Sequence, residues 1–374
     1  MGAPTDAYKP FSRLNGSRDN VAFAGARAAM NIKMGNEIVY RPEDIDWDAP
    51  GKRRYDVAFH LDSSWGYSLL PLTVINGLKD SGAASTPPGV AVFGGNHGNE
   101  WEGQIAVKRL CNDLDPRQLT GRIILVPQLS PSACAANSRL SPLDSVNMNR
   151  AFPGNPRGSV SYRIAHFVTS RIFPLARIVV DLHSGGVEGG FALCASIHSV
   201  PDATQYDEMV AAAKLFDTPF VFVYSSDMAS GLLSDEAESK GKITIGGEFG
   251  FGETVSRIGV RHAYEGVKNL LRFYGHLAEP VLKIDSKRTA GPRLVSATSL
   301  EAYQPAPLDG IWEPAVDLGD TVAAGTTIGY IHDFSNQAAP LHEIRAQRDG
   351  ILIMMHAPAA CARGVTLYVI ASPV

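Results

Sequence analysis

The residues best suited to chemistry in this chain are His97 and Glu100, which lie three positions apart in the glycine-rich run 94–100. This run directly follows the apolar segment 90–93, which predicts a buried strand. An imidazole and a carboxylate on such a turn can converge on one cation. A third ligand is available in His183, which follows another apolar segment. Two histidines and one glutamate with an open fourth position are typical of hydrolytic zinc sites. The sequence therefore predicts one Zn²⁺ per chain and a metal-dependent hydrolase.

Hydrolysis also needs a base that takes a proton from water and passes it to the leaving nitrogen. Glu248, between glycines 246–247 and 250, follows the apolar run 243–245. A carboxylate among small residues beside an apolar wall is expected to have a raised pKa, which suits this role. The alternative is that Glu248 caps a helix that begins near Thr254. Its position at a strand end favours the base.

Cationic and amide donors gather in one loop after the predicted strand 123–126. They are Arg139, Asn149 and Arg150. An arginine fork matches carboxylate geometry, and an asparagine adds a directional donor, so these residues suit a developing oxyanion or a substrate charge. The alternative for a loop arginine is a solvated surface charge.

Two interpretations remain open within the predicted site. The pair His97 and Glu100 also has the spacing of a surface pair on a helix. Asp181 either orients His183 or caps the next segment. Glu102 fits a first-turn charge favoured by the helix dipole better than a metal ligand.

Apolar strands alternate with amphipathic helices from about residue 56 to 280. The expected strands are 57–61, 72–74, 90–93, 123–126, 178–181, 220–224 and 243–245, and the expected helices are 102–110, 160–173, 205–216 and 255–277. This order predicts an α/β fold with a mixed, mostly parallel sheet and helices on both faces. Ligands of open α/β sheets lie beyond the carboxyl ends of the strands, so His97, His183 and Glu248 are expected to share one crevice.

The pattern changes after Pro280 to short strands and turns that nearly repeat. Asp309-Gly310-Ile311 recurs forty residues later as Asp349-Gly350-Ile351. The repeat predicts a smaller β-barrel or sandwich made by duplication. Its first half resembles biotinyl/lipoyl-carrier folds, but neither half has a lysine at a hairpin tip, so we expect a structural role. The predicted division is a catalytic domain at 1–285, with a covering segment at 1–55, and a β-domain at 286–374.

Composition narrows the functional classes. The 374 residues carry a net charge of −4, and 45% of them are hydrophobic, enough for a large core. No lysine or arginine run suggests nucleic-acid binding, and no apolar stretch is long enough to span a membrane. The N-terminal residues lack the features of a signal peptide, and the four cysteines form no CxxC motif, so we expect free thiols and a cytoplasmic location. A homo-oligomer remains open.

The motifs at 95–103, 149–150, 181–183 and 247–248, taken together, resemble the succinylglutamate desuccinylase/aspartoacylase family of zinc carboxypeptidase-like hydrolases. Within it, 96–103 and 141–154 are most similar to N-acetyl-diaminobutyrate deacetylases of ectoine degradation. The resemblance implies that zinc is bound by His97, Glu100 and His183, and that Glu248 acts as the general base and acid. It also implies that Arg139 polarises the scissile carbonyl, while Asn149 and Arg150 bind a carboxylate of the substrate. Zinc carboxypeptidases often have an aspartate at the position of Asn147, and the segment 359–365 also differs from those deacetylases.

The sequence thus predicts a zinc-dependent deacylase of a small N-acyl amino acid, with N-acetyl-L-2,4-diaminobutyrate as the leading candidate and acetate as a product. A second candidate is a zinc carboxypeptidase that acts on peptide C-termini. A third, from a different class, is a non-catalytic binding module with a degenerate site.

Overall fold

Three central strands bring the predicted site residues to one edge of the sheet. Strands β4 (Val90–Gly94), β6 (Ile178–Leu182) and β10 (Ile243–Glu248) are adjacent and parallel. Every residue of β4 and β6 is buried, as expected for parallel strands covered on both faces. An isolated parallel bridge joins His183, just beyond β6, to Glu248 at the end of β10. The carboxyl ends of these strands therefore form the floor of one crevice.

The computed structural model describes residues 36–62, 64–79, 86–225 and 230–374, and residues 36–374 form one compact unit. Within the described residues, fifteen strands belong to one sheet. Its main path runs β1-β2-β3-β5-β4-β6-β10-β8-β9-β11-β19-β17-β14, while β12 pairs with β19 and β7 with β17. The strands not yet defined are β1 (Glu37–Val39), β2 (Gly51–His60), β3 (Tyr67–Asn76), β5 (Arg122–Val126), β7 (Gly189–Phe191), β8 (Cys194–Ser199), β9 (Phe220–Ser225), β11 (Arg293–Ala297), β12 (Tyr303–Pro305), β14 (Thr321–Val322), β17 (Gly350–His356) and β19 (Thr366–Pro373).

The sheet is mixed, as predicted. Parallel pairing joins β5, β4, β6 and β10 in the centre, then β8, β9 and β11, and also β1 with β2. Antiparallel pairing joins β2 to β3, β3 to β5, and β10 to β8. It also attaches β19 to β11, so C-terminal strands extend the same sheet.

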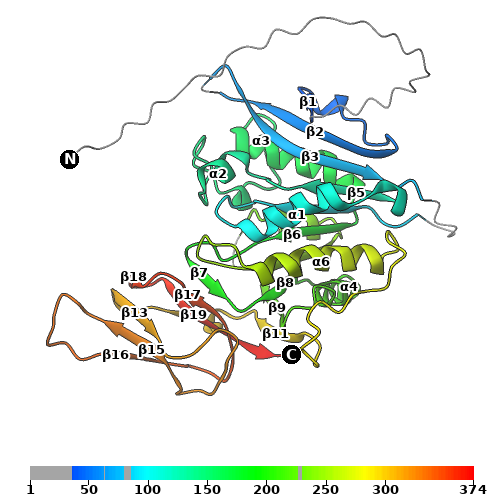
Figure 1. Cartoon of the computed structure of the whole chain (residues 1–374). Helices are drawn as coiled ribbons and strands as arrows, with labels where there is room; N and C mark the ends of the chain where they lie inside the picture. The colour runs from blue at the N-terminus through cyan, green and yellow to red at the C-terminus, as the bar shows by residue number, and fades with distance from the viewer. Residues whose placement is uncertain (1–35, 63, 80–85, 226–229) are drawn as a thin grey trace, which may run out of the picture. The chain divides into compact units, whose positions relative to one another are not determined.

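Helices cover both faces of this sheet (Figure 1). One apolar cluster joins α1 (Trp101–Asp113), α4 (Ala203–Lys214) and α6 (Arg257–Phe273) to one face. A second cluster joins α3 (Val160–Phe167) and α5 (Leu233–Glu238) to the other. Alternate residues of β4 enter the two clusters, because successive side chains of a strand point to opposite faces. A further short helix, α2 (Pro131–Ala136), follows β5.

The predicted strands and helices are present, with ends that shift by a few residues. The helix expected at 160–173 leaves α geometry after Phe167 and continues as a π-helical turn at Val168–Ile172 and a 3₁₀ turn at Phe173–Leu175. Pro174 lies in that last turn and cannot donate a backbone hydrogen bond, which disfavours a regular α-helical end. Strands β7 and β8 and helix α5 were not among the predicted elements.

The repeated C-terminal segment has strands that pair across its two halves. The first half contains β12, β13 (Gly310–Pro314), β14 and β15 (Thr327–His332), and the second contains β16 (His342–Arg345), β17, β18 (Ala360–Cys361) and β19. Partners are exchanged: β12 pairs with β19, β16 with β15, β14 with β17, and β18 with β13. Strands β16-β15-β13-β18 form the smaller sheet, and one apolar cluster joins the two halves.

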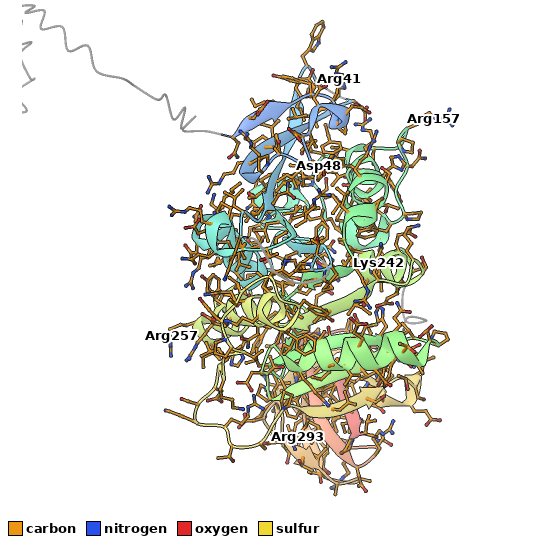
Figure 2. All side chains as sticks on the ribbon, turned by 90° about the vertical axis from the view of Figure 1, so that its right-hand side faces the viewer. Arg41, Asp48, Arg157, Lys242, Arg257 and Arg293 are labelled. Atoms are coloured by element: carbon orange, nitrogen blue, oxygen red, sulfur yellow. The ribbon has the colours of Figure 1, made fainter. Side chains whose placement is uncertain are left out.

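Charged side chains are spread over separate elements of the surface (Figure 2). Arg41, Arg157, Arg257 and Arg293 are all exposed, and they belong to segments distant in the sequence. The four cysteines are free and buried, as predicted. Within the described residues, no helix is both long and apolar enough to cross a membrane.

Two predictions of organisation concern segments at the margins. Residues 1–35 of the predicted covering segment lie outside the described residues. The remaining part contains β1 and the start of β2, which are strands of the large sheet. The domain boundary between residues 285 and 286 stays a prediction.

Candidate metal centre

The loop between β4 and α1 directs Glu100 into the crevice. Gly95 has a φ of +66°, and a Cβ at Gly98 would lie 2.0 Å from the carbonyl of Ala133, so both positions require glycine. Glu100 occupies the N-cap position of α1, but its side chain accepts no hydrogen bond from that helix. The carboxylate instead faces the two predicted histidine ligands. The positive end of the helix dipole favours a carboxylate there.

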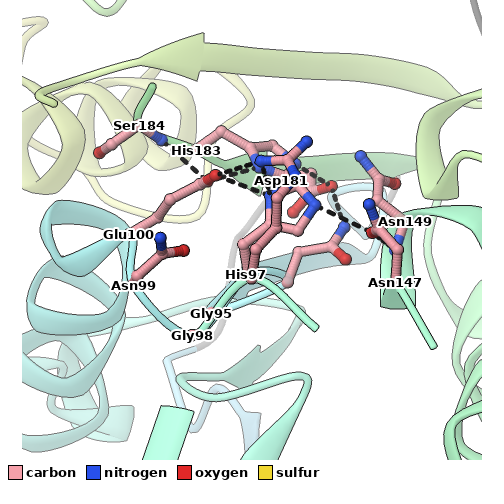
Figure 3. A network of polar contacts seen from close by, with 12 residues as sticks. Gly95, His97, Gly98, Asn99, Glu100, Asn147, Asn149, Asp181, His183 and Ser184 are labelled. Atoms are coloured by element: carbon pink, nitrogen blue, oxygen red, sulfur yellow. Dashed lines mark hydrogen bonds and ion pairs between the residues drawn. The ribbon is translucent and has the colours of Figure 1, made fainter. Parts of the chain in front are cut away.

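The carboxylate of Glu100 contacts both His97 and His183 (Figure 3). Its Oε1 is 2.7 Å from Nδ1 of His97, and its Oε2 is 2.8 Å from Nδ1 of His183. The backbone N–H of Ser184 also donates to Oε2, at 3.1 Å. The candidate ligand atoms of the three residues all lie within 4.8 Å of one another. The structure thus brings together the three residues predicted to bind zinc.

The outer nitrogen of each histidine has an acceptor of its own. Nε2 of His97 is 3.0 Å from Oδ1 of Asn147, which is identified as the amide oxygen because it also accepts from the backbone N–H of Asn149. Nε2 of His183 is 2.8 Å from Oδ2 of Asp181. Both Nε2 atoms therefore carry a proton, and Asp181 orients His183, one of the two interpretations left open by the sequence.

This arrangement fits a metal ion. With Nε2 protonated, a neutral imidazole turns the lone pair of Nδ1 toward the Glu100 carboxylate. Lone pairs that face each other at 2.7–2.8 Å repel unless a proton or a metal ion lies between them. Hydrogen-bonded outer nitrogens are also the usual support of metal-bound histidines. The donor set has the composition of a hydrolytic zinc site, two imidazole nitrogens and one carboxylate.

The charges of the site are strongly coupled. Burial alone would raise the pKa of Glu100, but His97 and His183 together lower it below its usual value. Burial lowers the pKa of His183, yet the carboxylates of Asp181 and Glu100 raise it well above the usual range. Both shifts show that the centre favours positive charge beside Glu100.

Glu248 occupies the position predicted for the base. Burial and the Glu100 carboxylate raise its pKa to about 8, although His183 and Arg139 oppose the rise. Its Oε2 is buried and has no hydrogen-bond partner within the described part of the chain. The helix-capping alternative is excluded because Ser256 caps α6, accepting from the N–H of Gly259.

Arg139 reaches the same centre from the loop after α2. Its Nη1 is 3.3 Å from Oε1 of Glu100 and 3.4 Å from Nδ1 of His97. The side chain is 35% exposed, so part of it faces the open crevice. Arg139 is therefore placed to donate to a group bound beside Glu100.

Asn149 and Arg150 line the cavity from a short turn. The Oδ1 of Asn149 accepts from the N–H of Leu233 at 3.0 Å and so holds the start of α5. This bond leaves the amide NH₂ of Asn149 as the donor end. Nη1 of Arg150 donates to the carbonyl of Asn149 at 2.6 Å, while burial lowers its pKa. Both residues line the same cavity as Glu248.

A cavity of about 360 Å³ connects these residues. Residues of β6, β8, β9 and β10 line it, and on β6 and β9 they alternate, as expected for one face of a sheet. The C-terminal strands supply a further wall, formed by Tyr303, Met354, Thr366 and Val369. The volume is in the range of small-molecule sites.

Residues 87–274 match the family model of the succinylglutamate desuccinylase/aspartoacylase catalytic domain. A curated relative, the N-alpha-acetyl-L-2,4-diaminobutyric acid deacetylase of Halomonas elongata, is 34% identical over 334 residues, which cover 88% of this chain and 94% of the relative. The chain belongs to the succinylglutamate desuccinylase/aspartoacylase family.

Solved structures agree. A succinylglutamate desuccinylase/aspartoacylase from Rhodobacter sphaeroides superposes with a TM-score of 0.82 at 32% identity, covering 88% of this chain and 98% of the other. The product-bound ectoine utilization protein of Ruegeria pomeroyi superposes with a TM-score of 0.78 at 30% identity and the same coverage. The resemblance read from the motifs is confirmed at the level of family and fold.

Glu102 has a larger structural role than its position in the sequence indicates. Glu102 does lie in the first turn of α1, as predicted, but it is only 1% exposed. Its carboxylate accepts from the hydroxyl of Ser184 at 2.6 Å and from the N–H of Ser256 at 2.7 Å. It thereby ties the loop that carries His183 to the start of α6. A buried carboxylate of this kind has no local sequence signal, since its partners lie far along the chain.

Proposed function

We propose that this protein is a zinc-dependent deacylase of small N-acyl amino acids, with N-acetyl-L-2,4-diaminobutyrate as the leading substrate. The observation that carries the proposal is the arrangement of two imidazole Nδ1 atoms around the carboxylate of Glu100, with Glu248 next to them. The products would be acetate and the free amine.

His97, Glu100 and His183 would hold the zinc ion. A bound zinc ion would supply Lewis-acid chemistry, lowering the pKa of water and polarising the scissile carbonyl. Glu248 would accept the proton of the attacking water through its unpaired Oε2 and return it to the departing amine.

Other side chains would hold the substrate in register. Arg139 would donate to the carbonyl oxygen as negative charge develops on it. Asn149 and Arg150 would bind the α-carboxylate, one with a directional amide and the other with a planar fork. If this pair aligns the scissile bond, its loss should lower kcat as well as raise KM.

Two further observations support the choice of substrate class. The Halomonas elongata relative is named as a deacetylase of N-acetyl-diaminobutyrate, and its similarity extends over 88% of this chain. The cavity of about 360 Å³ has a wall from the C-terminal strands, which suits a small molecule.

A zinc carboxypeptidase is the second candidate, because the same pair of residues would accept the terminal carboxylate of a peptide. The C-terminal wall of the cavity favours the smaller substrate. A non-catalytic binding module is the third candidate, and the complete set of ligand candidates beside Glu248 argues against it.

The decisive experiment combines metal analysis with a substrate panel. Purified protein should contain about one zinc per chain and lose amine release on chelation, with recovery on zinc addition. The panel consists of N-acetyl, N-succinyl and N-formyl amino acids together with blocked dipeptides. Cleavage of the dipeptides alone would favour the carboxypeptidase. A protein that cleaves no member of the panel, with or without added zinc, would favour the binding module.

A further inference from the structure

A second polar cluster lies in the same cavity, away from the candidate metal centre. Nδ1 of His198, on β8, is 2.8 Å from Oε2 of Glu238 and 3.3 Å from Oδ1 of Asp235, both on α5. The hydroxyl of Thr244, on β10, donates to the other oxygen of Glu238. His198 is 1% exposed, and it lines the cavity together with Glu238 and Thr244.

This cluster differs from the metal centre in the outer nitrogen of its histidine. At His97 and His183 that nitrogen has an acceptor, so Nδ1 presents a lone pair. Nε2 of His198 is buried and has no hydrogen-bond partner within the ranges that the structure describes. A neutral His198 therefore keeps its proton on Nδ1 and donates it to Glu238. The contact is complete without a metal ion.

Negative charge remains in excess at this end of the cavity. The ion pairs of Asp235 and Glu238 in the described part of the chain are those with His198, which a neutral imidazole does not compensate. Burial and the Glu238 carboxylate raise the pKa of Asp235 to about 6, although His198 opposes the rise. Glu238 is buried and Asp235 is partly buried, so two carboxylates without a full cationic partner are costly here, and a cationic ligand would offset that cost.

The cluster and the proposed base lie on one continuous surface. Thr244 and Glu248 face the cavity from the same strand, four residues apart, which corresponds to roughly 13 Å between their Cα atoms. Tyr224, on the neighbouring strand β9, pairs with His198, and their ring centroids are 4.4 Å apart. A substrate with a few carbons between its scissile carbonyl and a cationic group suits this span.

One short helix links this cluster to the proposed carboxylate site. Asn149 holds the N-terminus of α5 through the N–H of Leu233, and Asp235 and Glu238 follow on the same helix. The electrostatic influence of Arg150 reaches Asp235 and lowers its pKa. A bound amino acid would therefore have the Arg150 guanidinium near its carboxylate and the carboxylates of Asp235 and Glu238 at a neighbouring position.

We propose that His198, Asp235 and Glu238 form a subsite for the side-chain ammonium group of the substrate, so that the enzyme selects N-acyl amino acids with a cationic side chain. The subsite rests on the proposed deacylase function. Glu238 supplies the charge, Asp235 adds to it, and the hydroxyl of Tyr224 offers an acceptor on the cavity wall. Neutral and acidic side chains would leave the two carboxylates without a cationic partner.

The test compares kcat/KM for N-acetyl-L-2,4-diaminobutyrate with kcat/KM for N-acetyl-L-2-aminobutyrate, which has the same carbon skeleton without the amine. Wild-type enzyme is expected to prefer the cationic substrate by about 10–100-fold, the usual range for a hydrogen bond to a charged group. Glu238→Gln should reduce this preference by about 10-fold or more. Glu236→Gln is the matched control, because Glu236 lies on the same helix but pairs with Lys240.

The outcomes separate the two proposals. If wild-type enzyme hydrolyses neither of these substrates nor any N-acyl amino acid of the panel, the deacylase function is wrong; if it hydrolyses only other members of the panel, the ammonium subsite is wrong. If it hydrolyses both equally well, or if Glu238→Gln leaves the ratio intact, the ammonium subsite is wrong. The ratio of the two kcat/KM values in the wild-type enzyme tests the subsite without any variant, so the proposal can still be refuted if Glu238→Gln fails to fold. A second zinc ion per chain that is lost in Glu238→Gln would assign the cluster to a metal and overturn the proposal.

Discussion

Oδ1 of Asn147 lies 3.0 Å from Nε2 of His97, so an uncharged amide supports this histidine while the Asp181 carboxylate supports His183. A carboxylate acceptor makes an imidazole a stronger ligand than an amide does. The two histidines of the centre are therefore expected to differ in basicity. Position 147 thus has an uncharged amide oxygen, within hydrogen-bond distance of His97, where zinc carboxypeptidases often have the carboxylate of an aspartate.

Removing this acceptor should weaken metal binding. We expect Asn147→Leu to lower zinc affinity by about 10–100-fold, because the orientation and proton position of His97 are then free to change. Asn147→Asp should bind zinc at least as tightly as the natural protein. Competition with a chromogenic chelator measures both. Equal affinities in all three proteins would contradict a supporting role for Asn147.

Glu248→Gln should separate metal binding from turnover. The amide has nearly the same size but cannot accept the proton of water, so amine release should fall by about 10²–10⁴-fold. Zinc content should stay near one per chain, since Glu248 is not among the metal ligand candidates. Metal analysis and a ninhydrin-type amine assay test the two expectations together. Retained turnover would remove Glu248 from its proposed role.

The pH profile should follow the ionisation of Glu248. Its pKa is raised to about 8 in the metal-free protein, first by burial and then by Glu100, while Arg139 lowers it. Only the carboxylate accepts a proton, so kcat/KM should rise with pH through this pKa and fall below it. A bound cation moves this acid limb below pH 8, because positive charge stabilises the carboxylate.

A charge change at Arg139 gives a matched test of that profile. Arg139→Ala removes a positive charge that lowers the pKa of Glu248, so the acid limb should move to higher pH. The position of the limb is independent of the loss in maximal rate. Profiles of kcat/KM from about pH 5 to about pH 9 measure it. A shift to lower pH would contradict the assignment.

Arg150 should act through the substrate carboxylate. Arg150→Ala is expected to lower kcat/KM for N-acetyl amino acids by about 10–100-fold, the value of a charged hydrogen-bond pair. The same variant should have little effect on the corresponding amino acid amides, which lack the carboxylate. Asn149 is a poorer test because it also holds the start of α5. Equal losses on acids and amides would argue against the carboxylate role.

Glu102→Ala should destabilise the protein without touching a metal ligand. It leaves the hydroxyl of Ser184 and the N–H of Ser256 without their acceptor, which costs about 2–4 kcal/mol in unfolding free energy. Urea unfolding of the metal-free protein measures the loss. Glu236→Gln, which alters a surface pair, is the control and should change stability by less than about 0.5 kcal/mol.

The main features of the site could be predicted because both histidine candidates and the proposed base lie at or shortly after the end of an apolar strand. His97, His183 and Glu248 stand at or just beyond the ends of β4, β6 and β10, and adjacent parallel strands bring such positions together. Locating the apolar strands in the sequence was therefore enough to place these three residues at one edge of the sheet. The likeness to a known family then supplied the roles of the loop residues.

The second cluster was not predicted, for physical reasons. His198 lies on β8, a short strand in which Ser196 and His198 alternate with Ala195 and Ile197, a pattern that indicates a strand only once it is sought. Glu238 belongs to the six-residue helix α5, which is held by Asn149 rather than by a strong helical pattern. No local spacing relates residues on separate elements that meet only after folding.

The exchanged pairing of the C-terminal repeat has a consequence for incomplete chains. Strands β17 and β19 carry Met354, Thr366 and Val369 to the cavity, and they depend on partners from the earlier half of the repeat. A polypeptide truncated before Gly350 would retain each candidate zinc ligand together with Glu248, yet its crevice would lie open to bulk water on one side. Such a fragment would bind metal but would exclude solvent poorly. Its zinc content alone would therefore not show that it is active.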